Sequence, residues 1–414
     1  METQLREAAI LPAGLADADG SRDVKNSQIH ELHELLAAET SIEASALFRA
    51  CSQTIPTEAS DFVAEIQEKE RPVVCSVYTS PQETLTVIDH IVGPRNSSES
   101  GYVTDTPYDA DFVDEFIYIL NQPEFKKEHS ADQSTYPDLY GTPLDFDDGT
   151  RLPLFDGEPD RDQISQGALG DCGIIATLGA VAARYPEVIR DCISERDDGT
   201  YLVRLHDTEY HEESDEWRPT GRFINLVVDS QLPVRADEPG KPAFANGHCA
   251  WGPILEKAIA SLDQTWSEER RDSLEDGTGY LQLHGAGHAR WAELLTQLTG
   301  RPARCFTLDQ DDPECQEIID FLGQKISENE PVLISTRPTE EDEEPLPFGL
   351  LDAHAYEVVH IDSEDMVELH NPWNYRHPKE VTIFELMGKD LNESSCIHNN
   401  YVTLCDDVEE DSHP

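Results

Sequence analysis

A cysteine at the start of a helix is the feature of this sequence best suited to chemistry. Residues 166–172 read QGALGDC, and the apolar residues that follow recur at helical spacing. This predicts a helix from Cys172 to Tyr185 behind a glycine-rich turn. The partial positive charge of a helix N-terminus favours the thiolate, which is the attacking form of cysteine. We therefore expect Cys172 to be a nucleophile in a substrate cleft that Gly170 and Gly173 help to line.

An attacked carbonyl needs hydrogen-bond donors for the oxyanion that forms on it. Gln166, six residues before Cys172, can supply a side-chain N–H, and the backbone N–H of Cys172 can supply another. One such donor is worth about 3–4 kcal/mol in the transition state. Gln166 is thus the predicted oxyanion donor, although by itself it could equally be a surface turn residue.

The nucleophile also needs a base, and the base needs a partner that fixes its tautomer. His354 heads an alternating segment, and Asn371 ends the next one, 17 residues later. An antiparallel strand pair would place both side chains at the same end, where Asn371 accepts the imidazole N–H and Trp373 covers that bond from water. The structural alternatives are a strand histidine with a satisfied ring and an asparagine that starts a turn before proline.

The elements that must position these residues fall into three parts. Residues 1–135 read as a partly helical N-terminal extension ending in a Pro/Asp/Gly-rich linker. Residues 136–285 form a mostly helical lobe that carries the nucleophile. Residues 286–414 lean to β-sheet and carry His354 and Asn371.

Periodicity and turn residues give the individual elements. We expect helices over 28–69, 111–121, 172–185, 254–262, 290–298 and 314–327, and strands over 73–78, 201–205, 223–228, 331–336, 353–361, 366–369 and 401–405. Between Asn121 and Pro159 the composition shifts to Pro, Asp, Gly and Tyr, which is typical of a linker or an arm draped over a domain.

Composition excludes several functions. The 414 residues hold 30 basic and 84 acidic side chains, a formal net charge of −54, so a nucleic-acid partner is not expected. The acidity fits either a salty cytoplasm, as in a halophilic host, or a face for a cationic partner. No signal peptide and no membrane-spanning segment are visible, and we expect no membrane partner. Nine cysteines without a Cys-x-x-Cys pair favour a reducing, cytoplasmic location.

Metal and other hydrolase motifs are weak or missing. His284 and His288 are four residues apart, but the glycines between them disfavour the helix that would put both on one face. No Gly-x-Ser-x-Gly elbow and no phosphate loop occur. We therefore predict no metal site and no required cofactor.

Several motifs together carry a resemblance. QGALGDC, DAHAYEVV at 352–359 and LHNPW at 369–373 resemble, in this order, the catalytic motifs of calpains, which are papain-like cysteine proteases. VVDSQLP at 227–233 and WGPILEKA at 251–258 extend the likeness, which covers roughly residues 136–405. It implies a two-lobed α+β papain-like fold.

The resemblance also implies roles for four residues. Cys172 would be the nucleophile, His354 the base, Asn371 its orienting partner and Gln166 the oxyanion donor.

Two positions depart from the family pattern. Gly173 stands where the family usually has Trp, and Asn374 stands where it usually has Gly. We expect a missing wall of the cleft and altered substrate fit rather than lost chemistry. Calcium activation is common in the family, but the basic residues 374–379 replace a longer acidic loop, so one calcium site is expected to be absent. We also expect no C-terminal calcium-binding or membrane-binding domain.

The sequence thus predicts a calpain-like cysteine endopeptidase that acts on a protein or peptide substrate. The rival hypothesis is a catalytically inactive calpain-fold binding protein, for which Gly173 is the main support. A third hypothesis keeps the triad for acyl transfer or for removal of a small protein modifier. Any regulatory partner of the N-terminal extension is unknown.

Overall fold

The computed structural model describes ten segments of the chain, and they hold nearly all of the two predicted lobes. They are residues 73–79, 113–125, 137–143, 149–235, 237–238, 240–274, 277–307, 316–340, 343–387 and 395–405. The helices expected over 28–69 lie outside these segments.

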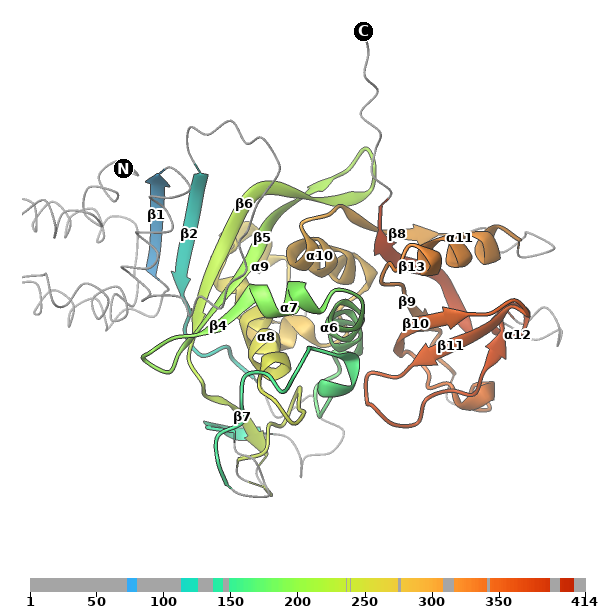
Figure 1. The fold of residues 1–414 in the computed structure, drawn as a ribbon, viewed down its shortest axis with the longest axis horizontal. Coiled ribbons are helices and arrows are strands. Elements are labelled where there is room, and N and C mark those ends of the chain that lie inside the picture. The colour runs from blue at the N-terminus through green and yellow to red at the C-terminus, as the bar shows by residue number, and fades with distance from the viewer. Residues whose placement is uncertain are drawn as a thin grey trace, which may run out of the picture.

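One mixed sheet of 11 strands runs through the described structure (Figure 1). Its order is β1-β2-β6-β8-β13-β9-β10-β11-β12, with β5 and β4 attached beside β6. The strands are β1 (Val73–Thr79), β2 (Val113–Ile119), β4 (Ile193–Glu195), β5 (Tyr201–His211), β6 (Glu216–Val228), β8 (Ala303–Thr307), β9 (Leu333–Thr336), β10 (Ala355–Ile361), β11 (Met366–His370), β12 (Val381–Thr382) and β13 (Ile397–Leu404). A separate pair joins β3 (Pro137–Gly141) to β7 (Leu232–Arg235).

The helices are concentrated in the first half of the described structure. The α-helices are α6 (Cys172–Arg184), α7 (Pro186–Cys192), α8 (Trp251–Ala260), α9 (Glu268–Asp272), α10 (His288–Thr299), α11 (Gln316–Ser327) and α12 (Ile383–Leu386). Short 3-10 turns are η2 (Arg161–Gln163), η3 (Leu262–Thr265), η4 (Gly279–Leu283) and η5 (Pro347–Gly349). Pro186 ends the expected helix, but it also starts α7, because proline suits the first turn of a helix.

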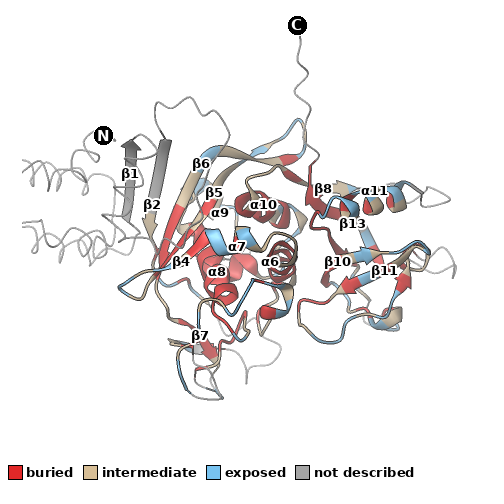
Figure 2. Ribbon diagram, viewed as in Figure 1, coloured by how far each residue is buried: buried red, intermediate tan, exposed pale blue. Residues whose placement is uncertain are grey.

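Two apolar cores define two lobes. The first gathers the buried faces of α6, α8 and α10 against β5 and β6, and these helices are the most buried elements in Figure 2. The second lies between α11 and strands β9, β10 and β11. The structure is therefore the two-lobed α+β fold expected from the sequence. Helix α10 belongs to the first core, although it follows the predicted boundary at residue 285.

The two lobes share the large sheet at a narrow junction. β6 and β8 are paired at Trp217 and Ala303. On the β-rich side, β13 lies between β8 and β9 and pairs antiparallel with both. The last strand in chain order is thus an inner strand, and it supports β9, which in turn pairs with β10.

The region before residue 150 differs from one expectation and bears on another. Residues 113–119 form β2, parallel to β6, so the helix expected over 111–121 is wrong. The segment is rich in β-branched and aromatic residues, which favour a strand. Part of the expected linker is also tied to the helical lobe: Leu120 is buried in the first core, and the pair of Asn121 and Gln264 exchanges two hydrogen bonds of 2.9 and 3.0 Å.

Candidate active site

The glycine-rich turn leads into α6, which lies on the side of the helical lobe that faces β10 (Figure 1). Cys172 is the first residue of α6, and the carbonyl of Asp171 accepts from the N–H groups of Ile174 and Ile175. The side chains of Ile174, Ile175 and the following turns are buried, which anchors the helix. Cys172 itself is half-buried, and its backbone N–H has no partner within the helix because it lies in the first turn.

The environment of the Cys172 thiol opposes ionisation. Burial raises the pKa of the Cys172 thiol to about 11, and the neighbouring Asp171 carboxyl also raises it. The backbone N–H of Ala355 and those at the start of α6 lower it, but by less. The N–H groups at the start of α6 thus favour the thiolate as expected, but burial has the larger effect on the pKa of the thiol. The contact with Ala355 places the sulfur beside the strand that His354 precedes.

His354 and Asn371 meet as the sequence predicts. His354 lies just before β10, and Asn371 lies just after β11, with which β10 pairs antiparallel. The Nε2 atom of His354 lies 3.0 Å from Oδ1 of Asn371. If Nε2 carries the proton of that bond, Nδ1 is the ring nitrogen left to exchange a proton with Cys172. Burial lowers the pKa of His354 and so favours the neutral imidazole, while the bond to Asn371 opposes this shift.

Asn371 is fully buried and is held on every polar atom of its side chain. Its Nδ2 donates to the carbonyl of Arg376 at 3.2 Å, and its Oδ1 also accepts from the N–H of Trp373 at 3.0 Å. The Trp373 ring lies 5.1 Å from the His354 ring in an edge-on arrangement. Trp373 therefore covers the imidazole as expected.

Gln166 joins the two lobes beside Cys172. Its backbone N–H donates to the carbonyl of Pro372 at 2.8 Å, and its Nε2 donates to the carbonyl of Leu169 at 2.7 Å. An amide nitrogen has two hydrogens, so one remains for an oxyanion. Oε1 of Gln166 is buried without a partner.

The two cleft glycines are in close contact with side chains from other elements. The N–H of Gly170 donates to Nδ1 of His284 at 3.3 Å, and the imidazole packs on the glycine. At Gly173 the indole of Trp291 occupies the space where a side chain would begin. The missing tryptophan at position 173 therefore leaves no gap behind the first turn of α6.

Asp171 and Glu256 form a buried pair of carboxyl groups behind the nucleophile. Asp171 is 2% exposed and Glu256 is 1% exposed. Oε1 of Glu256 accepts from the N–H of Ala245 at 3.0 Å, whereas neither side-chain oxygen of Asp171 has a hydrogen-bond partner. An ionised Asp171 opposes the ionisation of Glu256. Burial raises the pKa of Asp171 to about 7 and raises that of Glu256 well above its usual value.

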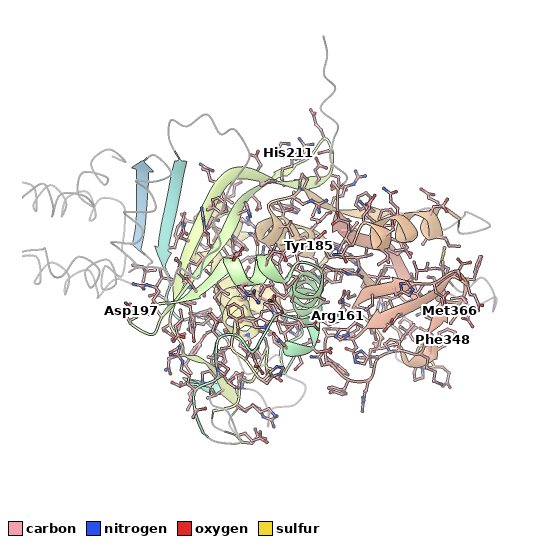
Figure 3. The ribbon with its side chains drawn as sticks, in the orientation of Figure 1. Arg161, Tyr185, Asp197, His211, Phe348 and Met366 are labelled. Atoms are coloured by element: carbon pink, nitrogen blue, oxygen red, sulfur yellow. The ribbon has the colours of Figure 1, made fainter. Side chains whose placement is uncertain are left out.

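Ion pairs and side-chain hydrogen bonds join the two lobes around the site. Arg161 makes a bidentate contact of 2.7 and 2.9 Å with Glu357 on β10, and Arg184 lies 3.8 Å from the same carboxylate. In Figure 3 Arg161 lies between α6 and the β-rich lobe.

Asn374, which stands where the calpain pattern usually has glycine, adds a second link between the lobes. It has a φ of 57°, the left-handed region that favours glycine. Its Nδ2 donates to the carbonyls of Ile164 and Asp162 at 2.8 and 3.0 Å.

Neither of two loops beside the site, residues 374–379 and 156–160, offers calcium a free set of oxygen ligands. No group of three or more His, Cys, Asp or Glu side chains in the described segments could hold a metal, and this includes His284 and His288. After Trp373, the side chain of Asn374 is taken by backbone carbonyls, and Arg376 and Lys379 are cationic. In the acidic loop 156–160, the carbonyls of Asp156 and Glu158 both accept from Nε2 of Gln163, at 2.9 and 2.8 Å. A neutral amide donor thus occupies the point where those oxygens converge.

Within the described segments no single helix is long and apolar enough to cross a bilayer. Helices α6 and α7 reach that length and apolar character only together, and they are bent by 111° where they meet.

Comparison with known proteins agrees with the geometry. The model of the calpain family of cysteine proteases matches residues 145–379, more than half of the chain and the whole of the site described above. The chain belongs to the calpain family. The match contains Gln166, Cys172, His354 and Asn371, which the structure brings to the junction of the two lobes.

The curated relatives of this calpain-family chain are distant and much longer. It is 25% identical to Calpain-9 of Homo sapiens over 224 residues, 52% of this chain and 29% of that protein. It is 27% identical to the calpain-type cysteine protease ADL1 of Oryza sativa subsp. japonica over 235 residues, 53% of this chain and 9% of that protein. It is 26% identical to Calpain-5 of Caenorhabditis elegans over 265 residues, 62% of this chain and 36% of that protein. The aligned part is well under half of each relative.

The sequence did not reveal the side chains that pack against the site but lie far from it along the chain. Trp291, Glu256 and Arg161 contact or support the catalytic elements, yet each is far from its partner in the sequence. Glu256 lies within the WGPILEKA segment, where a charged residue on the buried face of a helix was a signal that it needs a buried partner.

Proposed function

We propose that this calpain-family chain is a cysteine endopeptidase. The observation that carries the proposal is the 3.0 Å contact between His354 and Asn371 at the point where the N–H of Ala355 meets the Cys172 sulfur. A nucleophile, a base and a residue that orients the base thus come together from separate elements, as acyl transfer to sulfur requires. Membership of a protease family makes peptides the substrate class.

The geometry supports a definite sequence of steps. Nδ1 of His354 takes the thiol proton as the sulfur attacks the peptide carbonyl, and the oxyanion is held by the Cys172 N–H and the free N–H of the Gln166 amide. The imidazolium then protonates the leaving amine. Water, activated by the same imidazole, hydrolyses the thioester.

Calcium has no place in these steps, because the loops beside the site are held by Gln163 and Asn374. We also propose a cytoplasmic location, supported by the six free cysteines of the described segments.

Selective labelling by a papain-type epoxide tests the proposal. Cys305 is a matched internal control, because it is half-buried like Cys172 and burial raises its pKa to about 11 as well, but it has no imidazole of a triad beside it. We expect epoxide adducts at Cys172 and none at Cys305, and no adduct in Cys172→Ala. Equal or absent labelling of the two cysteines would contradict the proposal.

One observation favours the inactive binding protein as a second candidate. The raised pKa of the Cys172 thiol is what a resting, unreactive cysteine would show. Absent labelling in a folded protein that still binds peptides would establish this alternative.

A further inference from the structure

The first turn of α10 packs on Gly173, the residue that follows Cys172. Trp291 is 4% exposed, and its indole lies against the Cα of Gly173, the residue after Cys172. A Cβ built on Gly173 would overlap the Cε2 and Nε1 atoms of the indole. Position 173 therefore admits only glycine while Trp291 keeps its place.

The indole is fixed from two sides. Its Nε1 donates to the carbonyl of Ala286 at 2.6 Å, and its ring meets that of His288 at 4.6 Å. Trp291 is thus a rigid surface against which the Cys172–Gly173 peptide rests.

The same turn of α10 reaches the strand that carries the base. Nε2 of His288 lies 2.8 Å from Oγ of Ser335 on β9. Ser335 is the cross-strand partner of Ala355, which follows His354. Contacts therefore run from the nucleophile's peptide, through Trp291 and His288, to the start of β10.

We propose that Trp291 is a positioning residue of the catalytic site. It holds the Cys172–Gly173 peptide, and with it the sulfur and one oxyanion donor, at a set distance from the strand of His354. This inference rests on the proposed cysteine-protease function. It also explains why position 173 is glycine. The Trp291 indole of α10 occupies the space of a side chain there, so the residue after Cys172 must lack one.

A double-mutant cycle between positions 173 and 291 tests the inference. The readout is the second-order rate constant of epoxide labelling at Cys172, measured across pH, with thermal unfolding recorded in parallel. We expect Gly173→Ala and Trp291→Ala each to slow labelling by about tenfold or more, since a displacement of about 1 Å in a catalytic group costs about 100-fold. In Gly173→Ala/Trp291→Ala the methyl group enters the vacated space, so labelling should be faster than in Gly173→Ala alone.

A matched control comes from the same helix. A Cβ on Gly179 would have its nearest neighbour, Cβ of Arg161, at 3.5 Å, which is an ordinary contact. Gly179→Ala should therefore label at the rate of the unmodified protein. If Trp291→Ala does not fold, Trp291→Phe leaves a smaller cavity, and we expect it to slow labelling less.

The outcomes separate the inference from the function on which it rests. Labelling of the unmodified protein, with Gly173→Ala equal to it, would overturn the positioning role alone. A Trp291→Ala variant that loses only melting temperature, with unchanged rate and pH profile, would show a merely structural tryptophan and would overturn it too. An unmodified protein that is not labelled would overturn both.

Discussion

The Nε2 atom of His354 lies 3.0 Å from Oδ1 of Asn371, although 17 residues and a β-hairpin separate them. Two strands that pair antiparallel bring both side chains to one end of the sheet, next to the first residue of α6. The bond is buried under Trp373 and leaves Nδ1 for the thiol.

Removal of the Asn371 amide should slow the labelling of Cys172 by an epoxide. In Asn371→Ala the imidazole loses its orienting acceptor, and we expect epoxide labelling of Cys172 to fall by about a hundredfold, within the range that positioned acid–base groups contribute. Asn400→Ala on β13, which loses a 2.9 Å bond to Thr307, is the control and should label normally. A normal rate in Asn371→Ala would rule out an orienting role.

Loss of the ion pair between Arg161 and Glu357 should lower the free energy of unfolding by about 3 kcal/mol. Glu357 is 1% exposed, so Arg161→Ala leaves a buried carboxylate with the more distant Arg184. Loss of one partner of a buried pair costs about 3–5 kcal/mol, and Arg184 should hold the loss near 3 kcal/mol. Urea unfolding measures it.

The control for the ion pair is the exposed pair of Arg190 and Glu158, whose side chains are 43% and 68% exposed. Arg190→Ala should change stability by about 0–1 kcal/mol. Equal losses in the two arginine variants would mean that the link between the lobes adds nothing.

The raised pKa values of Asp171 and Glu256 predict that the fold loses stability as the pH rises from about 4 through 7. The folded pKa of Asp171, about 7, lies above the ordinary 3.8, and that of Glu256 is raised as well. A raised acid pKa stabilises the fold fully below about pH 4, and this contribution disappears as the pH rises through about 7. Thermal melting from pH 5 to 9 should show the fall.

Glu256→Gln separates this pair from other titrating groups. Glutamine is neutral at every pH, so Glu256→Gln removes the titration of one member of the pair and the fall in stability should shrink. Glu187→Gln, the same change at an exposed residue of α7, should leave the profile as it was. If the stability of Glu256→Gln falls like that of the unmodified protein, this pair does not set the pH dependence.

Calcium should not alter the rate of Cys172 labelling. The carbonyls of Asp156 and Glu158 already accept from the Gln163 amide, so added calcium or a chelator finds no loop to order or release. Gln163→Ala should cost about 1–3 kcal/mol, because both carbonyls lose their donor. A rate that rises with calcium would show an ion site that these contacts do not account for.

Short sequence motifs predicted those site residues that lie within the motifs themselves. The start of α6, the end of β11 and the alternating segment after His354 lie in short motifs, so Cys172, His354 and Asn371 could be named from the sequence. The segment 113–119 was expected to be helical, because its apolar residues fit both periods and only the parallel pairing with β6 decides between them. Gly173 was interpreted as a missing wall, since nothing in a sequence shows that Trp291 reaches it.

The place of β13 in the sheet has a consequence for biosynthesis. Residues 397–404 lie between β8 and β9, and β9 pairs with the strand that follows His354. While a ribosome is still making the chain, Cys172 and His354 emerge before the strand that completes their sheet. Because domains form from the N-terminus as they are synthesised, the helical lobe can fold first, but the two catalytic groups come into register only when residues 397–404 are free to insert. We therefore expect the sheet that positions His354 to be completed only late in the synthesis of the chain.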